Sequence, residues 1–403
     1  MEAWLRALTF STGYNTSLVT LGAMLLGASA GMIGSFILLR KRSLVSDAIS
    51  HATLPGLAVA FIVMALLTGD GRWLPGLLAG AGISAALGLW GVQGISERTR
   101  LGEDAAIGAV LSVLFGLGVV LITVIQVMHT GGQAGLTGYL VGATAGMLAA
   151  EAHLIGLCGL LLLVAIFMLR RQFLLVCFDA EYAYTNGIQA QRIDMLMLLL
   201  LLAVTVIGLK VTGLILIVAL TIIPPVTGRF WTDRPLHMVA IAAICGALAG
   251  YLGVTLSSVH TGLPTGPLVV LSAFGLFALS LLFSPRRGIV AMLSAHYRFK
   301  TKVHLRQGLL ALARREAIYD ALTLRVLRRH GYIRRDHVPT PSGKAAARDA
   351  DHEEQLWSLY RSLYPDEAAH LDHLGLEPIG NCLPPDTVTT LESCLPLSPR
   401  VAS

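Results

Sequence analysis

The sequence predicts an all-α polytopic membrane protein with about eight to nine transmembrane helices, followed by a small cytoplasmic α+β domain. Of its 403 residues 55% are hydrophobic and only 13% are charged, whereas about a quarter of a soluble domain is charged. Several apolar runs before residue 285 exceed the roughly 18 to 20 residues that cross a bilayer. Lys and Arg gather in the last third. We therefore expect a transmembrane domain over 1–288, a cytoplasmic domain over 289–377 and a disordered tail over 378–403.

Apolar segments separated by short polar joints define the expected spans, in the order 18–39, 52–68, 73–93, 105–128, 134–169, 192–209, 212–228, 236–257 and 266–284. The 134–169 segment is too long for one straight span and carries Glu151 and His153, so we expect two helices there, one of them short or re-entrant. Pro224 and Pro225 must interrupt the hydrogen bonding of their span, which predicts a kink or a gate.

Basic residues predict the orientation of the chain in the membrane. They occupy alternate joints, at Arg40 to Arg42, Arg98 and Arg100, Arg170 and Arg171, Arg229 and Arg234, and Arg286 and Arg287. The positive-inside rule places these joints in the cytoplasm. The N-terminus is then outside and the C-terminal domain inside.

The stretch SLVSDAISHATLPG, residues 43–56, places Asp47 and His51 four residues apart on one helical face. Ionisable groups at membrane depth are functional candidates, and a carboxylate with an imidazole suits Mn, Fe or Zn. Two ligands do not complete a site, so further donors must come from a facing helix, a partner subunit or water. The alternative is that Asp47 caps the helix and His51 is an interfacial histidine. LPG at 54–56 predicts a helix break, as in many transporter sites.

Five runs of the sequence, in order, resemble the ABC-type permeases that import zinc, manganese or iron. The resemblance covers residues 15–288. The runs are GMIGSFILLRKRSLVSDAISHATLPGLAVAF, RLGEDAAIGAVLSVLFGLGVVL, FDAEYAYTNGI, LTIIPPVTGRFWTDRP and LPTGPLVVLSAFGLFALSLLFSPRRG.

The resemblance implies a permease subunit of the bacterial plasma membrane, with Asp47 and His51 as ligands of the transported metal. It implies a dimer with an identical or different permease, a separate ABC ATPase and an extracytoplasmic binding protein. FDAEYAYTNGI would dock on the ATPase through Asp179, Glu181, Ala183 and Gly187, which echo a Glu-x-Ala-x-x-x-Gly element. No GxxxxGK[ST] sequence occurs, so ATP hydrolysis belongs to a partner. We expect no permanently bound cofactor.

Other ionisable residues match no motif. For His129, Glu151, His153 and His260 we expect loop or packing roles. Glu103 and Asp104 lie where the start of a helix favours acidic residues.

The segment 323–374 resembles the winged helix of diphtheria-toxin-repressor-like metalloregulators, with GYIRR and VPTPSGKAAA supplying two wing strands. Asp372 and His373 fall near an expected metal-ligand pair, while other ligand positions hold Glu354 and Ser358. Its basic patch suits the phosphates of DNA or, equally, anionic lipid headgroups. The patch comprises Arg325, Arg328, Arg329, Arg334 and Arg335.

Three other functions remain open on the sequence alone. They are a proton-coupled secondary metal carrier or channel, a permease for an organic metal chelate, and a membrane-anchored metal-responsive regulator. The small residues around Asp47 argue against the wide aromatic cavity that a chelate needs. Two ligands do not decide among Mn, Zn and Fe.

Overall fold

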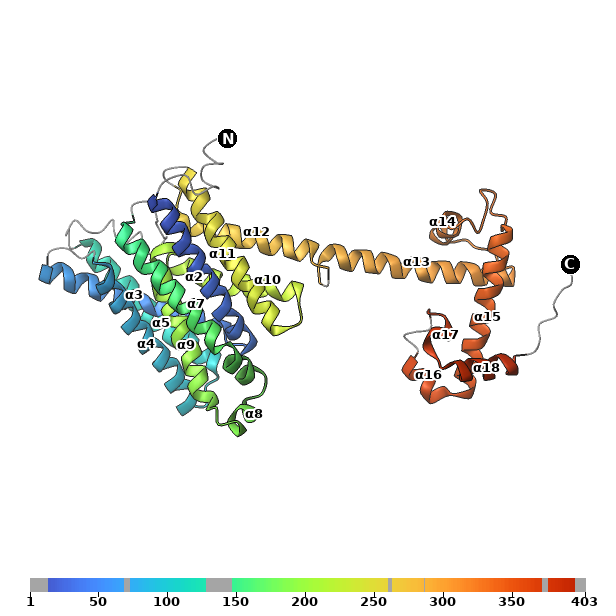
Figure 1. Ribbon diagram of the computed structural model, residues 1–403, viewed down its shortest axis with the longest axis horizontal. Helices are drawn as coiled ribbons and strands as arrows, with labels where there is room; N and C mark the ends of the chain where they lie inside the picture. Colours follow the sequence, from blue (N-terminus) through green and yellow to red (C-terminus); the bar gives the residue numbers. More distant parts are fainter. Residues whose placement is uncertain are drawn as a thin grey trace. The chain divides into compact units, whose positions relative to one another are not determined.

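The computed structural model describes residues 14–68, 73–127, 147–259, 263–285, 287–371 and 376–395. The chain divides into two compact units, Met1–Val290 and Ala291–Ser403. Both consist of helices in their described parts (Figure 1).

The described part of the first unit has eight helices long and apolar enough to cross a membrane, which confirms a polytopic membrane protein. These are α2 (Tyr14–Leu39), α3 (Ser43–Thr68), α4 (Leu74–Arg98), α5 (Glu103–Val127), α7 (Ala149–Phe178), α9 (Ala190–Thr212), α11 (Pro235–Val259) and α12 (Thr265–Phe283). Two further helices are α8 (Ala180–Thr185), between α7 and α9, and the apolar α10 (Leu214–Trp231).

Helix α2 lies at the centre of this unit and packs against α7, α10 and α11. Glycines allow the closest approach, because a Cβ on Gly27 would lie well under 3.0 Å from the carbonyl oxygen of Gly246 in α11. Gly31 meets Ala242 of α11 in the same way. Small residues at such positions let backbones pack in lipid, where the hydrophobic effect does not drive helices together.

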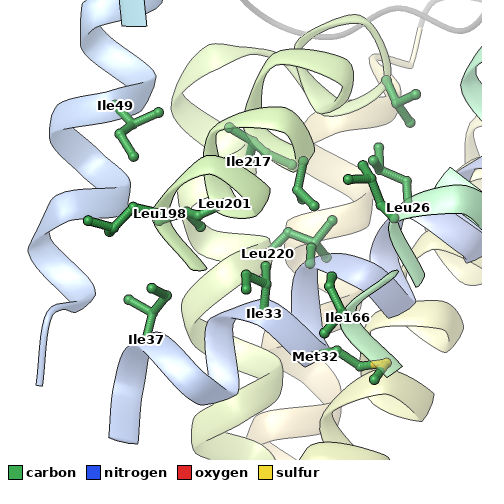
Figure 2. Close-up of a cluster of buried hydrophobic side chains, with 14 of the residues drawn as sticks. Leu26, Met32, Ile33, Ile37, Ile49, Ile166, Leu198, Leu201, Ile217 and Leu220 are labelled. Atoms are coloured by element: carbon green, nitrogen blue, oxygen red, sulfur yellow. The ribbon is translucent and has the colours of Figure 1, made fainter. Parts of the chain in front are cut away.

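A buried apolar cluster joins α2 to its neighbours. Figure 2 shows Leu26 and Ile33 of α2 in this cluster with Ile166 of α7, Leu201 of α9 and Leu220 of α10. All five side chains are at most 1% exposed. The cluster holds α9 and α10 in place beside the start of α3.

The predicted helix break at 54–56 is wrong, because α3 is one helix of 26 residues that continues through Pro55. Proline removes one backbone hydrogen bond, and membrane helices tolerate this loss where a neighbouring helix packs closely. Gly118 of α5 supplies that close packing, since a Cβ at Gly118 would lie 3.2 Å from Pro55 Cδ. Pro224 and Pro225 likewise lie inside the continuous helix α10.

The two helices expected over 134–169 stay a prediction, because only the second part of that segment lies within the described residues. Residues 128–146 lie outside the described part, and α7 is a single helix of 30 residues from Ala149 to Phe178. Glu151 is in its first turn and His153 follows two residues later. These polar residues therefore belong to a helix end, where water or backbone groups can satisfy them.

The second unit comprises α13 (Ile289–Arg314, which starts just before the unit boundary), α14 (Ala321–Arg329), α15 (Pro341–Leu363), α16 (Pro365–Leu371), α17 (Ile379–Cys382) and α18 (Pro385–Cys394). It has two small cores. One, around Leu309 and Leu327, joins α13 to α14 and α15. The other, around Trp357 and Tyr360, joins α15 to α16, α17 and α18.

The predicted α+β character of this unit is wrong for its described residues, which form no strand. The proposed wing is one isolated antiparallel bridge between Ile333 and Pro339. Two hydrogen bonds of 2.9 Å flank the bridge, from the Arg334 amide to the Val338 carbonyl and from the Thr340 amide to the Tyr332 carbonyl. The pairing goes no further because α15 begins at Pro341, directly after its N-cap Thr340. The turn between Ile333 and Pro339 is also short, with His337 at a φ of 65°.

The tail expected to be disordered after Pro378 instead forms α17 and α18. Ile379 and Leu391 are 2% and 1% exposed in the core around Trp357. A few apolar side chains at the right positions therefore fix this segment without a long periodic pattern. Residues 396–403 lie outside the described part.

We predict that Gly27→Ala destabilises the membrane unit. The added methyl would overlap the Gly246 carbonyl, which belongs to a helix backbone and cannot move away cheaply, so the cost should be about 1–3 kcal/mol. Thermal unfolding of the protein in detergent measures the change. Gly82→Ala is the matched control, because nothing lies within 4 Å of a Cβ at Gly82. Equal unfolding temperatures for the two variants would contradict the packing account.

Candidate functional site

Asp47 and His51 lie side by side in the first three turns of α3. Oδ1 of Asp47 is 3.4 Å from Nε2 of His51. The Asp47 side chain is 43% exposed and the His51 side chain 18% exposed. The pair is thus accessible at the surface of this single chain, and its spacing of four residues has the predicted effect of stacking the two side chains.

The rotation of α3 about its own axis is fixed one residue before Asp47. The Ser46 hydroxyl is hydrogen-bonded to the Thr221 hydroxyl of α10, at 2.7 Å, and both residues are buried. Ser50, one turn further along α3, is also buried, and its hydroxyl donates a hydrogen bond to the Ser46 carbonyl at 3.0 Å. Because Ser46 faces α10, its neighbour Asp47 is directed away from that contact. The hydrogen bond between Ser46 and Thr221 could not be predicted from the sequence, because serine and threonine are common in membrane helices.

Besides Asp47, the imidazole of His51 contacts an aromatic ring. It packs edge-to-face with Phe115 of α5, with ring centroids 4.9 Å apart. Its Nδ1 is buried and has no hydrogen-bond partner among the described residues. In addition, Pro55 has no N–H to donate to the His51 carbonyl four residues earlier. The site therefore has polar capacity that the surrounding helices do not use.

The distance between the two side chains matches a shared metal ion. Two donors that each lie about 2.1 Å from an ion, at a tetrahedral angle, are about 3.4 Å apart. Asp47 Oδ1 and His51 Nε2 have this separation. However, no group of three or more His, Cys, Asp or Glu that could hold a metal occurs within the described ranges. The described part of one chain therefore offers at this place two of the four donors that a tetrahedral metal site needs.

Ion pairs fix the joint that precedes α3. Arg40 pairs with Asp194 of α9 and donates to the Val176 carbonyl of α7 at 3.3 Å. Arg42 pairs with Glu103 at the start of α5 at 3.2 Å. From the sequence these arginines indicated only orientation. The structure shows that they also connect the metal-candidate helix to three neighbouring helices.

Helix α8 carries the residues expected to contact an ATPase. Asp179 caps it by accepting a hydrogen bond from the Tyr182 amide at 2.8 Å, while Glu181 is exposed and Ala183 fully buried. Gly187, at a φ of 77°, ends the helix: its amide bonds to Tyr184 and the next amide bonds to Ala183, both at 3.0 Å. Glu181 is thus exposed to a partner, Ala183 packs inside the chain, and Gly187 ends the helix.

A shallow groove of about 870 Å³ lies beside α8. Its lining residues include Glu181, Tyr184, Gln189, Arg192 and Met195. They come from α8 and from the start of α9. A partner that fills this groove would touch the helix that carries Asp194.

The remaining predicted candidates have local partners, are buried in a helix or lie outside the described residues. Glu151 pairs with Lys210 of α9 at 3.5 Å, and exposed His153 contacts the Ala149 carbonyl at 2.7 Å, so both have local partners. Pro224 and Pro225 are buried in α10. His129, His260, Asp372 and His373 lie outside the described residues.

In the second unit, two suggested ligand positions are engaged elsewhere. Glu354 pairs with Arg306 at 2.7 Å, and the Ser358 hydroxyl bonds within its own helix to the Gln355 carbonyl. The predicted basic residues Arg325, Arg328, Arg329, Arg334 and Arg335 are all exposed.

Comparison with known proteins gives a consistent result for the first unit. A family model described as the ABC 3 transport family matches residues 14–284. The manganese transport system membrane protein MntC of Bacillus subtilis is 40% identical over 74% of this chain and 67% of its own length. The zinc transport system membrane protein TroC of Treponema pallidum is 33% identical over 70% of this chain and 92% of its own length.

A solved structure is also similar. PsaBC from Streptococcus pneumoniae, in complex with Fab, is 28% identical with a TM-score of 0.60, and the match covers 71% of this chain and 98% of that chain. The family model ends at residue 284 and does not reach the second unit.

We predict that Arg40→Ala is strongly destabilising. It leaves Asp194, 15% exposed, without its cation, and breaking a buried pair costs about 3–5 kcal/mol. Arg287→Ala is the matched control, because its pair with Asp233 is about half exposed and should be worth at most about 1 kcal/mol. Thermal unfolding compares the variants. The double variant Arg40→Met/Asp194→Leu should recover most of the loss. If Arg40→Ala unfolds no earlier than Arg287→Ala, the joint is not anchored as described.

Proposed function

The chain belongs to the ABC 3 transport family, and we propose on that basis that it is the membrane permease of an ATP-driven importer of Mn²⁺, Zn²⁺ or Fe²⁺. The observation that supports this most directly is the Asp47–His51 pair, 3.4 Å apart on a membrane helix. A carboxylate and an imidazole together suit these borderline first-row ions better than Mg²⁺ or Ca²⁺. Binding must be transient, because an ion that is held too tightly does not leave.

A second permease copy completes the site in this proposal. Two chains related by a two-fold axis would each contribute Asp47 and His51, which gives the four donors that one chain lacks. Helix α5, which carries Phe115 beside His51, has the surface for this contact. Only 17% of the apolar 18-residue segment of α5 is buried within one chain, against 72% of the corresponding segment of α2. A closely related but different permease would serve equally.

The energy comes from a separate ATPase that docks on α8. Tyr182 and Tyr184 are 57% and 73% exposed there, beside the exposed carboxylate of Glu181. By the positive-inside rule, the basic joints favour a cytoplasmic α8 and second unit and an N-terminus outside, where a binding protein would deliver the ion.

The contacts of the chain supply a route from the ATPase to the metal. Helix α8 leads directly into α9, and Asp194 of α9 holds Arg40 at the joint before α3. A displacement of α8 by the ATPase would move α9 and, through this ion pair, the helix that carries Asp47 and His51. Such a movement would open the half-sites toward the cytoplasm.

One alternative is a proton-coupled carrier, which would take up metal without ATP, whereas the importer requires ATP and its ATPase. Metal or DNA binding by the second unit stays a prediction, and the exposed arginines around α14 are its support.

We predict that Asp47→Asn and His51→Gln each reduce ATP-driven uptake of Mn²⁺, Zn²⁺ and Fe²⁺ at least about tenfold, because each removes one of few ligands. Uptake is measured in proteoliposomes that contain the permease, its ATPase and its binding protein. Asp104→Asn and His153→Gln are matched controls, since both residues are exposed at helix starts.

Copurification of the ATPase with each variant shows that assembly is intact. Normal uptake of every metal by the Asp47 and His51 variants would remove the site assignment. Uptake in the wild type without ATP would instead favour the proton-coupled carrier.

A further inference from the structure

The first three turns of α13 carry an apolar face that the second unit does not cover. Six large side chains of this segment are between 38% and 66% exposed. They are Ile289, Val290, Met292, Leu293, Tyr297 and Phe299. At about 100° per residue, all six fall within roughly one half of the helix circumference. The opposite half has small or polar residues: Ala291, Ser294, Ala295, Arg298 and Thr301.

This face is not a continuation of the packed face of the same helix. The second half of α13 packs against α14 through Leu305, Gly308, Leu309 and Leu312. By the same helical geometry, these residues are centred about 140° away from the exposed apolar face. The first half of α13 therefore has its own apolar surface, which needs its own partner.

The charged side chains in the sequence of this segment have one sign only. The sequence has no Asp or Glu between Asp233 and Glu316. Residues 284–315 instead carry Arg286, Arg287, Arg298, Lys300, Lys302, Arg306, Arg314 and Arg315. Arg287, Lys302 and Arg306 pair with Asp233, Glu377 and Glu354, whereas Arg298 and Lys300 are exposed in the first half of the helix. These two cations attract the anionic headgroups of a leaflet.

The chain itself keeps this helix near a bilayer. Only five residues, 284–288, separate the end of α12 at Phe283 from the start of α13 at Ile289. Five residues reach at most about 18 Å. The start of α13 therefore stays within reach of the headgroups beside the last span.

We propose that residues 289–300 of α13 form an interfacial helix that binds anionic phospholipid. The apolar face enters the boundary between headgroups and acyl chains, where Tyr297 and Phe299 suit the interface. Lys300 lies within the apolar face and extends its ammonium group to the phosphates along an apolar stem. Arg298, on the opposite side, adds long-range attraction. This contact does not depend on which ion the permease transports.

Spin labels on the full-length protein test the proposal. In a chain whose native cysteines are replaced by serine, a nitroxide is attached at Met292→Cys on the apolar face or at Ser294→Cys on the opposite side. Collision with oxygen, which partitions into lipid, and with a water-soluble nickel chelate is measured by electron paramagnetic resonance. The vesicles contain phosphatidylcholine alone or an equimolar mixture with phosphatidylglycerol.

With phosphatidylglycerol, the Met292→Cys label should be more accessible to oxygen than to nickel, and the Ser294→Cys label should show the reverse. The contrast should weaken in phosphatidylcholine alone and at high salt. Equal nickel accessibility at both positions would overturn the proposal. So would a Met292→Cys label shielded from both reagents, which would indicate a protein partner on this face.

Charge reversal supplies the matched comparison. Arg298→Glu/Lys300→Glu should lower the oxygen-to-nickel ratio at Met292→Cys in phosphatidylglycerol vesicles. Lys344→Glu/Arg348→Glu makes the same change of charge at exposed positions of α15 and should leave this ratio unchanged. An equal effect of the two pairs would show that only the overall charge matters, and the local lipid contact would be rejected.

Discussion

A polar group inside a bilayer must find a partner, and this constraint separates the anchors of the first unit from its candidate site. Arg40 pairs with Asp194, Lys210 with Glu151, and the Ser46 hydroxyl with Thr221. Asp47 and His51, 3.4 Å apart, differ in exposure, because the Asp47 side chain is 43% exposed, against 15% for Asp194 and 16% for Glu151. Their remaining bonding capacity is what an ion and a second permease would use.

The same anchors hold Asp47 and His51 in the geometry of the proposed half-site. Ser46 fixes the rotation of α3, Phe115 fixes the imidazole plane, and Arg40 fixes the joint before the helix. A site that binds an ion transiently cannot rely on the ion to organise its ligands. The surrounding packing must do so, and the glycine-mediated approach of α2 and α11 makes that packing dense.

Local features of the sequence were enough to predict most of the spans and the stacking of Asp47 on His51, because hydropathy and helical periodicity depend on near neighbours. The contacts that position the site join residues 175 apart, for Ser46 and Thr221, and 154 apart, for Arg40 and Asp194, and no local pattern indicates them. The break expected at Pro55 was wrong for a related reason, since Gly118 on another helix offsets the cost of the proline. In the second unit, the expected wing strands are reduced to one bridge, because α15 begins only two residues after Pro339.

The central claim is that each chain supplies half of a metal site through Asp47 and His51. X-ray absorption and metal analysis of the purified transporter, loaded with Mn²⁺ and trapped with its ATPase, test it most directly. The account predicts one ion for every two permease chains, with imidazole nitrogen and carboxylate oxygen in its coordination sphere. One ion bound fully within each chain, or a sphere without imidazole nitrogen, would contradict it.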